Sequence, residues 1–371
     1  MEVIAYGTKT ASAKLSPLKF TRRDAGTGEI AIEISHCGVC HSDLHQARDD
    51  WDNTVWPCIP GHEIVGKVVA VGDGVSRFKV GDRAGVGCMV NSCQQCEMCK
   101  SGQEQFCTGP KSCTLTYNGP KQPDGTNTYG GYSTGLVVRE EFAITIPDEI
   151  DSEHAGPILC AGITTYQPMK WFGLKEGHVL GVAGIGGLGH MAVQIGKALG
   201  AKVVALTTSP EKEEAIKRLG ADEVVVMDDD EALEEHAASL DLIVNTIPYK
   251  HDINPYVKLM KPRSQIAVVG NFLGFDNVET ADLAFQHIGI TGSLIGGIAD
   301  TQEIIDLCAK HDIRPEIEMI EIDQINDAFM RMQDEDVRFR HVIDMASLRN
   351  HASASDEAET VADPERGEVV G

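Results

Sequence analysis

Residues 178–189 read HVLGVAGIGGLG, and this stretch decides how the middle of the chain folds. A short apolar run leads into the pattern Gly184-x-Gly186-x-x-Gly189, and residues 190–200 continue with the apolar spacing of a helix. Strand, glycine turn and helix in this order are the fingerprint of a dinucleotide-binding unit, in which the backbone approaches a pyrophosphate at the helix N-terminus. The alternative is glycines that only make a turn. We expect a nucleotide cofactor to contact Gly184, Gly186, Gly187, Leu188 and Gly189.

The alternation of strand and helix repeats after this stretch. Strand-like runs occur at 202–208 (KVVALTT) and 223–228 (EVVVMD), with the helical run PEKEEAIKRLG at 210–220 between them. Ser209 before Pro210 is a helix start signal, and Gly200 and Gly220 are helix stop signals. Further strand candidates lie at 241–247, 265–270 and 288–294. The pattern predicts an α/β fold with a doubly wound parallel sheet, the Rossmann type.

The segments on either side follow another pattern. Between Ile30 and Ile146, short alternating runs such as AIEIS and KVVAV are separated by turn signals such as VGDG, which predicts a mainly antiparallel β domain. A capping signal at Asp151 opens a helical segment, and a helix and a strand after Gly297 leave the repeating pattern. We expect one domain from 1–159 and 298–347, a nucleotide-binding domain at 160–297, and a disordered acidic tail at 348–371, which has too few large apolar side chains to bury.

Charge and hydropathy exclude several classes of partner. The 371 residues include 32 Lys and Arg against 56 Asp and Glu, a net charge of −24, so we expect no nucleic-acid partner. No apolar run is long enough to span a membrane, and the first thirty residues lack the pattern of a signal peptide, so we expect a soluble, cytoplasmic protein. The acidity fits either a well-hydrated surface or adaptation to a salty cytoplasm, although the Lys content weighs against the second.

Eleven cysteines, an odd number, are placed unevenly along the chain. Four of them crowd into a polar loop: Cys93, Cys96, Cys99 and Cys107. Such clustering argues against a disulfide framework, and four thiolates from one loop can close a tetrahedron around Zn²⁺. We therefore predict a structural zinc lobe at 91–110 whose folding energy comes from the metal, with Cys113 as an unliganded thiol. The alternative is a set of small buried side chains.

A second set of candidate ligands is dispersed. GVCHSDLH at 38–45 contains Cys40, His41, Ser42, Asp43 and His45, and PGHEIVG at 60–66 contains His62 and Glu63. Cys160 stands in the apolar context ILCAG at 158–162. A single Cys or His is more often a core or surface residue, so spacing alone leaves their role open.

Together these motifs carry a resemblance to a known family. GVCHSDLH, PGHEIVG, the cysteine lobe, ILCAGITTY and GIGGLGH occur in the order and at about the spacing seen in zinc-dependent medium-chain alcohol dehydrogenases. Within that family the chain resembles the cinnamyl alcohol dehydrogenase branch and its bacterial NADP-dependent aldehyde reductases, from Tyr6 to Met345. The resemblance implies a GroES-like catalytic domain beside the Rossmann domain, an alcohol or aldehyde as the small-molecule substrate, two zinc ions per chain and a homodimer.

The resemblance also implies roles for single residues. Cys40, His62 and Cys160 would hold a catalytic Zn²⁺, with Glu63 as a possible fourth ligand, and Asp43 would accept the other ring N–H of His62. Ser42 and His45 match the family's proton relay, whereas His41 would contact a cofactor phosphate at best. The nicotinamide side would be formed by two segments, with Val269, Gly270 and Asn271 in one and Ser293, Leu294 and Ile295 in the other.

The end of the second strand bears on the choice of cofactor. An NAD enzyme usually offers Asp or Glu to the ribose there, whereas this chain offers Thr207, Thr208, Ser209 and Lys212. Hydroxyls and an ammonium suit a 2′-phosphate, Glu211 tempers the inference, and the branch's NADP-binding residues fall on the same positions. We expect NADPH to be preferred and aldehyde reduction to be the main direction.

Substrate range and alternatives complete the prediction. We expect broad activity on aromatic and medium-chain aliphatic aldehydes in a pocket that includes Trp51, Trp56 and Leu115; the Leu stands where plant relatives have an aromatic residue. A non-catalytic nucleotide-binding protein would have lost zinc ligands or the glycine loop. A zinc-free quinone reductase would lack the lobe and ligands of the type of Cys40 and Cys160. Neither loss occurs in this sequence.

Overall fold

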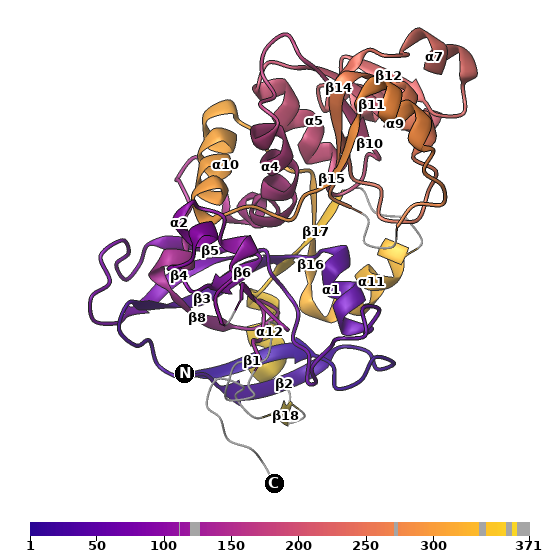
Figure 1. Ribbon diagram of the computed structural model, residues 1–371. Helices are drawn as coiled ribbons and strands as arrows, with labels where there is room; N and C mark the ends of the chain where they lie inside the picture. Colours follow the sequence, from indigo (N-terminus) through magenta and orange to yellow (C-terminus); the bar gives the residue numbers. More distant parts are fainter. Residues whose placement is uncertain (111, 119–126, 271–273, 334–338, 354–357, 362–371) are drawn as a thin grey trace. The chain divides into compact units, whose positions relative to one another are not determined.

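The computed structural model describes residues 1–110, 112–118, 127–270, 274–333, 339–353 and 358–361 (Figure 1). The chain divides into two compact units. The first comprises Met1–Cys160, Gly296–Ala309 and Arg314–Gly371, and the second comprises Ala161–Ile295 and Lys310–Ile313.

The second unit is built on a six-stranded parallel sheet with the order β12-β11-β10-β13-β14-β15. This is the strand order of a dinucleotide-binding fold, and it confirms the predicted doubly wound sheet. The strands are β10 (Val179–Ala183), β11 (Lys202–Thr207), β12 (Glu223–Val226), β13 (Leu240–Asn245), β14 (Met260–Val268) and β15 (Gly289–Gly292). The helices are α4 (Ile163–Trp171), α5 (Gly189–Ala198), η4 (Pro210–Lys212), α6 (Glu213–Arg218), α7 (Asp230–Glu235), α8 (Asn254–Lys258) and α9 (Thr280–Gln286).

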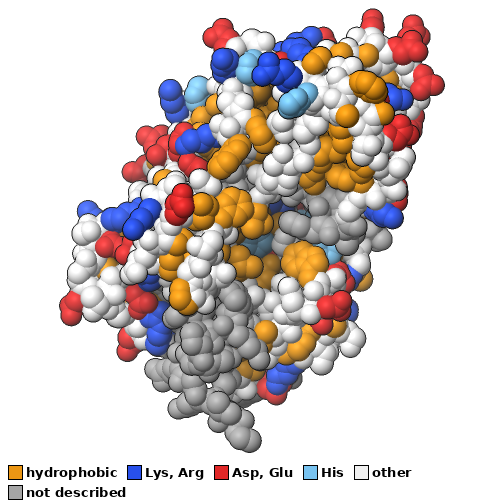
Figure 2. Space-filling model, viewed as in Figure 1, with side chains coloured by type: hydrophobic (Ala, Val, Ile, Leu, Met, Phe, Trp, Pro, Cys, Tyr) orange, Lys and Arg blue, Asp and Glu red, His pale blue; other side chains and the backbone are white. Residues whose placement is uncertain are grey.

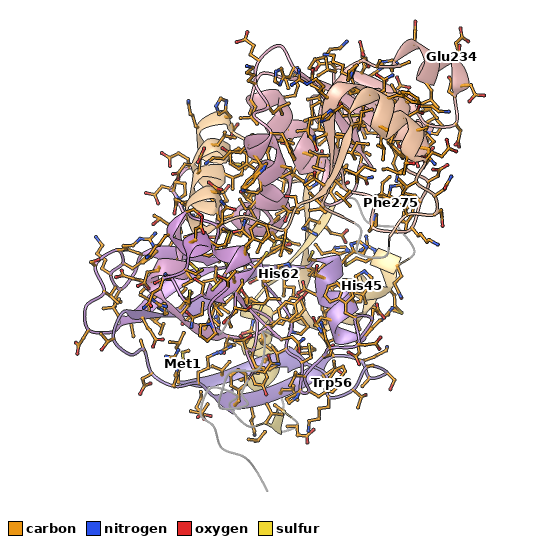
Figure 3. All side chains as sticks on the ribbon, in the orientation of Figure 1. Met1, His45, Trp56, His62, Glu234 and Phe275 are labelled. Atoms are coloured by element: carbon orange, nitrogen blue, oxygen red, sulfur yellow. The ribbon has the colours of Figure 1, made fainter. Side chains whose placement is uncertain are left out.

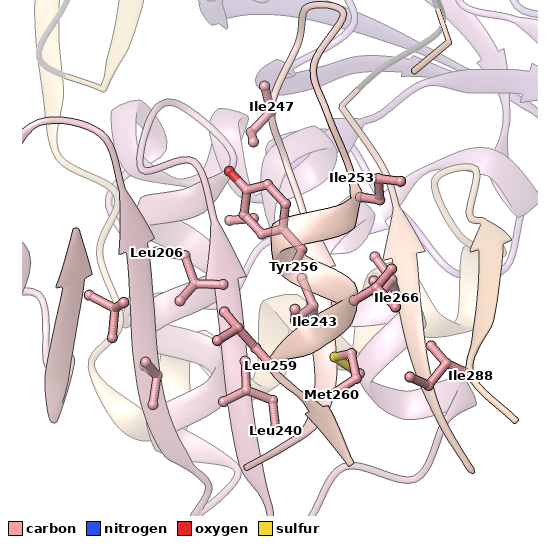
Figure 4. Packing of buried hydrophobic residues seen from close by; sticks show 14 residues of the cluster. Leu206, Leu240, Ile243, Ile247, Ile253, Tyr256, Leu259, Met260, Ile266 and Ile288 are labelled. Atoms are coloured by element: carbon pink, nitrogen blue, oxygen red, sulfur yellow. The ribbon is translucent and has the colours of Figure 1, made fainter. Parts of the chain in front are cut away.

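Apolar runs explain why these strands occupy the centre of the unit. β11 and β13 are buried along almost their whole length, as expected for parallel strands covered on both faces. Figure 4 shows part of the resulting core, in which Leu206, Ile243 and Ile266 from the sheet belong to one buried cluster with Tyr256 of α8. The glycine loop follows β10, which is buried from Leu180 to Ala183.

The first unit is mainly antiparallel, as predicted. Its seven-stranded sheet has the order β16-β17-β3-β4-β5-β9, and β8 pairs with β3; only β16 and β17 run parallel. The strands are β3 (Glu29–Gly38), β4 (Ile64–Val71), β5 (Arg83–Val86), β8 (Gly135–Arg139), β9 (Ile144–Thr145), β16 (Ile317–Glu321) and β17 (Arg340–Asp344). Smaller sheets contain β1 (Glu2–Gly7), β2 (Ser16–Thr21) and β18 (Glu359–Thr360), and β6 (Met89–Asn91) with β7 (Thr114–Leu115).

Short helices connect these strands. They are α1 (His41–Ala47), α2 (Glu97–Lys100), η1 (Glu104–Phe106), η2 (Glu140–Phe142), α3 (Ser152–Pro157), α10 (Ile298–His311), η5 (Ile322–Gln324), α11 (Ile325–Gln333) and α12 (Ala346–Ser353). The helical segment expected from Asp151 onward is interrupted, because a π-helical turn at Ile158–Gly162 separates α3 from α4. Such turns occur frequently at functional sites, and this one carries Cys160.

The predicted disordered tail needs correction where the structure describes it. Residues 346–353 form α12, and Glu359–Thr360 pairs with β2 in parallel. Leu348 is completely buried and Ala358 is buried, so the segment does have apolar anchors that its polar composition conceals. Residues 354–357 and 362–371 of the predicted tail lie outside the described residues.

Within the described part of the chain, none of the helices combines the length and apolar character needed to cross a bilayer. On the face shown in Figure 2, Lys and Arg side chains are interspersed with Asp and Glu side chains.

Candidate active site

Metal-binding side chains from three separate segments converge in the first unit. Cys40 directly precedes α1, His62 and Glu63 directly precede β4, and Cys160 lies in the π-helical turn. Their ligand atoms all lie within 4.8 Å of one another, and all four residues are buried. The sulfur atoms of Cys40 and Cys160 are 4.0 Å apart, and Nε2 of His62 is 3.2 Å from the sulfur of Cys160. The fold thus brings together the residues that spacing alone left open.

The chemistry of this donor set fits a zinc ion. Two free thiols and an imidazole are typical ligands of a catalytic zinc with three protein ligands. A hydrogen bond with Cys160 lowers the pKa of the Cys40 thiol well below its ordinary value, burial opposes this, and the positive charge of Arg340 adds to the lowering. The thiolate that binds a cation is therefore favoured at Cys40.

Asp43 holds the metal-binding loops in place. The Oδ1 atom of this fully buried carboxylate lies 3.0 Å from the backbone nitrogen of Gly61 and 3.0 Å from Nδ1 of His62. Its Oδ2 atom accepts the backbone N–H of Cys40 at 2.9 Å. Because a carboxylate can only accept, a neutral His62 ring carries its proton on Nδ1, and Nε2 then has its lone pair toward the cluster.

Glu63 has an unusual partner. Its Oε1 atom lies 2.9 Å from Nη2 of Arg340 on β17, and both side chains are buried. The contact lacks the alignment of a hydrogen bond, and neither carboxylate oxygen of Glu63 has a hydrogen-bond partner. A buried carboxylate with unsatisfied oxygens beside three ligand atoms is available as a fourth ligand.

Ser42 and His45 lie one turn apart on α1. The hydroxyl of Ser42 is 3.8 Å from the sulfur of Cys40, and Nδ1 of the partly exposed His45 is 2.8 Å from Oδ2 of Asp50. Figure 3 labels His45 on α1 and His62 ahead of β4. The two residues therefore lead from the cluster toward solvent, which is the arrangement a proton relay needs. His41 is exposed, with its ring 6.3 Å from that of His45.

The four lobe cysteines form a second group. Their sulfur atoms lie within 4.8 Å of one another. Cys99 lies in α2, Cys96 directly precedes α2, Cys107 directly follows η1, and Cys93 lies in the preceding loop. The sulfur of Cys113 is 3.7 Å from Sδ of Met89 instead, and Cys113 does not belong to the group.

Backbone N–H groups point at these sulfur atoms. Cys93 accepts from Gln95 and Cys96 at 3.5 and 3.3 Å, and Cys107 accepts from Cys93 and Gly109 at 3.4 Å each. Backbone N–H groups of Cys99 and Thr108 lower the pKa of Cys96 to about 5. The pKa of Cys93 is lowered as well, by the backbone N–H groups of Gln95 and Cys96, whereas burial raises the pKa of Cys99 to about 12. Without a metal ion, the lobe thus favours the thiolate at two of the four positions that a closed tetrahedral zinc site uses.

The glycine loop of the second unit is shaped for a ligand. Gly184 follows β10 with a φ of +81°, and a Cβ on Gly189 at the start of α5 would lie 2.0 Å from the carbonyl oxygen of Gly184. A Cβ on Gly186 would meet no protein atom within 4 Å. The fold itself requires Gly189, whereas the bare Gly186 leaves room for a phosphate at the N-terminus of α5.

The residues after β11 that are predicted to bind the 2′-phosphate differ in their exposure to solvent. Thr207 is buried, and its Oγ1 accepts the backbone N–H of Ser209 at 3.0 Å. Thr208 and Lys212 are exposed and Ser209 is half-buried, so these three are accessible to a phosphate. Glu211 is exposed as well.

The residues predicted for the nicotinamide side and for the substrate pocket lie as follows. A Cβ on Gly270 would lie 2.3 Å from the carbonyl oxygen of Thr246, Ser293 donates its backbone N–H to Val268, and Ile295 has a φ of +35°. Val269 is buried and Leu294 is exposed, while Asn271 lies outside the described residues. Of the predicted pocket residues, Trp51 has its ring 5.6 Å from that of His45, Trp56 is half-buried and Leu115 is exposed on β7.

Sequence reasoning missed four residues near the cluster. Arg340 contacts Glu63, and Tyr132 contacts Asp43. The ring of Tyr117 lies 5.6 Å from that of His62. Each is far from its partner in the chain, so no local motif reveals it. Asp50 is different: it follows His45 by five residues, and an acid close to a candidate relay histidine was a usable signal.

Comparison with known proteins extends over both units. Two family models match the chain, the alcohol dehydrogenase GroES-like domain over residues 26–148 and the zinc-binding dehydrogenase over residues 187–310. Aldehyde reductase YahK of Escherichia coli (strain K12) is 46% identical over 350 residues, which are 94% of this chain and 99% of the relative.

Solved structures give the same result. A cinnamyl alcohol dehydrogenase (SbCAD4) from Sorghum bicolor has a TM-score of 0.89 and 39% identity, covering 93% of this chain and 98% of its own. CAD from Helicobacter pylori, complexed with NADP(H), has a TM-score of 0.86 and 37% identity, covering 93% and 99%. The resemblance inferred from the motifs is confirmed.

Proposed function

The chain belongs to the zinc-binding alcohol dehydrogenases, and we propose that its main activity is the reduction of a broad range of aldehydes to primary alcohols with NADPH. Interconversion of alcohols and aldehydes follows from the family. The observation that carries the finer proposal is the convergence of the ligand atoms of Cys40, His62 and Cys160 beside Glu63.

The proposed catalytic zinc would be held by Cys40, His62 and Cys160, and a second, structural zinc by the four lobe cysteines. When bound, the catalytic ion supplies a Lewis acid that polarises the aldehyde carbonyl. Asp43 fixes the tautomer and orientation of His62, and burial of the cluster keeps bulk water away from the reacting group.

The proton that completes the alcohol would come through α1. His45 exchanges protons with solvent and is oriented by Asp50, and the hydroxyl of Ser42 lies on the inner side, next to Cys40. In the direction of reduction the serine hydroxyl would hand its proton to the substrate oxygen, and the proton that replaces it on the serine would be the one that the imidazole takes up from water.

NADPH supplies the hydride, and the second unit would bind it. The glycine loop from Gly184 to Gly189 would receive the pyrophosphate, and Thr208, Ser209 and Lys212 would receive the 2′-phosphate. Lys212 adds a positive charge there, and the similar Helicobacter pylori protein is complexed with NADP(H). We propose Gly270, Ser293 and Ile295 as nicotinamide-side residues.

We also propose a homodimer, as the resemblance implies. β15 is the last strand of the six-stranded sheet, so one of its edges is not paired within the described chain. Pairing of two such edges would continue the sheet across the dimer.

A combined metal and activity measurement tests the proposal. Purified protein should contain two zinc ions per chain and oxidise NADPH in the presence of aromatic and medium-chain aliphatic aldehydes, at least tenfold more efficiently than NADH. Cys40→Ser should abolish turnover while one zinc per chain remains. Absence of a second zinc, or equal efficiency with both cofactors, would overturn the corresponding part of the proposal.

A further inference from the structure

Asp43 receives a hydrogen bond from a residue that has no place in the relay or among the candidate ligands. The hydroxyl of Tyr132 lies 3.1 Å from Oδ2 of Asp43, and both side chains are completely buried. With this bond, Oδ1 of Asp43 faces donors from Gly61 and His62, and Oδ2 faces donors from Cys40 and Tyr132. The hydroxyl of Tyr117 is a further hydrogen-bond partner of the same carboxylate.

Tyr132 is itself held firmly by the loop that carries His62. Its backbone N–H donates to the carbonyl of Pro60 at 2.9 Å, and its carbonyl accepts the backbone N–H of Tyr6 at 2.8 Å. Gly61 has a φ of +103°, and a Cβ there would lie 2.7 Å from Cδ1 of the Tyr132 ring. Gly61 therefore lets the tyrosine ring sit directly against the backbone beside the imidazole.

These contacts form a chain from a fixed ring to a ligand atom. The Tyr132 hydroxyl holds Oδ2 of Asp43, Oδ1 of the same carboxylate holds Nδ1 of His62, and Nε2 of that ring faces the cluster. A carboxylate that is bonded at both oxygens cannot rotate freely, so the direction in which it points at the imidazole depends on both donors at Oδ2, the backbone N–H of Cys40 and the hydroxyl of Tyr132. Hydrogen bonds to a buried charge are also among the strongest in proteins.

We propose that Tyr132 is a positioning residue for the metal-binding imidazole, acting through Asp43. The inference rests on the proposed function, because it assigns His62 to a metal ion. Loss of the hydroxyl removes one of the donors that hold Oδ2 of Asp43 and loosens the orientation of His62. The site therefore releases its ion faster, and the enzyme turns over more slowly.

The test is Tyr132→Phe, which removes the hydroxyl and keeps the ring. Its matched control is Tyr129→Phe, another buried tyrosine, whose ring packs edge-on against Phe20 at 5.1 Å. Zinc release from each protein is followed with a coloured chelator, alongside kcat, the KM for NADPH and the thermal midpoint. Partners of metal ligands contribute roughly 10- to 100-fold to metal affinity. We expect about tenfold faster release of one zinc per chain from Tyr132→Phe, a kcat lowered by a similar factor, and an unchanged KM for NADPH.

A purely structural tyrosine gives a different result. If Tyr132 were only structural, both Tyr132→Phe and Tyr129→Phe would have a lower thermal midpoint, and zinc release and kcat would stay as in the wild type. That result would overturn the inference. Cobalt substitution adds a spectroscopic readout: the visible bands of the cobalt protein should shift in Tyr132→Phe and not in Tyr129→Phe, and unshifted bands also overturn it. The zinc content of the wild type distinguishes failure of the proposed function from failure of this inference. A wild type without the second zinc refutes the proposed function. A wild type with two zinc ions, together with a Tyr132→Phe variant that behaves like it, refutes only the role of Tyr132.

Discussion

Nη2 of Arg340 lies 2.9 Å from Oε1 of Glu63, and this buried ion pair ties β17 to the loop of the candidate zinc ligands. Burial raises the pKa of the Glu63 carboxyl to about 7, and Arg340 opposes that rise. The guanidinium is therefore the main reason why a carboxylate can stay charged beside two thiols. A buried pair of this kind is costly to break, because the remaining charge has no partner.

Replacement of Arg340 should reveal that cost. We expect Arg340→Met to lower the free energy of unfolding by about 3–5 kcal/mol, measured by urea denaturation, because it leaves the buried carboxyl of Glu63 without its cationic partner. The matched control is Arg331→Met: Nη1 of Arg331 lies 2.7 Å from Oε1 of Glu318, but the two side chains are 40% and 42% exposed. An exposed pair contributes up to about 1 kcal/mol. Equal losses in the two variants would contradict the structural role assigned to Arg340.

The cysteine lobe should depend on its metal. We expect Cys107→Ser to lower the zinc content from two ions per chain to one and to reduce the thermal midpoint, because the lobe has little core of its own. The lobe also supports α10, since a carboxylate oxygen of Glu104 accepts the backbone N–H of Ile298 at 3.2 Å. Cys113→Ser is the control: burial raises the pKa of that thiol to about 12, so it stays protonated and should leave the zinc content unchanged. An unchanged thermal midpoint after loss of the lobe zinc would refute the prediction.

What the sequence could reveal depended on distance along the chain. The glycine loop and the cysteine lobe are local, because their residues are neighbours in sequence and their spacing reports geometry directly. His62 and Cys160 are 98 residues apart, and Tyr132 and Asp43 are 89 apart. No periodicity connects such positions, so the trio needed the resemblance, and Tyr132 and Arg340 needed the folded chain.

In the C-terminal tail, composition was a poor guide to local structure. Composition predicted disorder from residue 348, yet Leu348 is buried in α12. One apolar side chain in a polar segment barely changes its composition, although it is enough to anchor a short helix against a preformed core.

The preference for NADPH should depend on Lys212. This exposed lysine at the end of η4 adds a positive charge to the region proposed for the 2′-phosphate. We expect Lys212→Ala to raise the KM for NADPH about tenfold and to change the KM for NADH little, in steady-state assays. Lys217→Ala, one turn further along, is the control, because Nζ of Lys217 already pairs with Glu213 at 2.6 Å. A similar change in the KM for both cofactors would argue against recognition of the phosphate.

If His45 only transfers a proton, a small base added to the solution should be able to take its place. We expect His45→Ala to lower kcat by about 100-fold, the lower end of the usual contribution of a general acid or base, and added imidazole to restore part of the rate. His41→Ala removes an exposed ring from the same helix and should lower kcat by less than about twofold if no proton passes through it. Failure of imidazole to rescue His45→Ala, with intact zinc content, would show that the residue acts in another way.

Acid should weaken the second unit through Asp241, which ties three neighbouring strands together. Its Oδ2 atom accepts the backbone N–H of Val179 on β10 at 2.8 Å and the ammonium of Lys261 on β14 at 2.7 Å. Burial alone would raise the pKa of Asp241, but these two bonds hold it below the ordinary value. A lowered pKa in the folded state means that the carboxylate stabilises the fold above the unfolded pKa of about 4 and loses this effect as the pH falls through the folded value. We therefore expect Asp241→Asn to cost about 1–2 kcal/mol at pH 7, measured by urea denaturation, and the difference from the wild type to shrink below about pH 4. Glu234→Gln on the exposed face of α7 should leave stability unchanged at every pH, and a pH-independent loss in Asp241→Asn would show that its contribution comes from packing rather than charge.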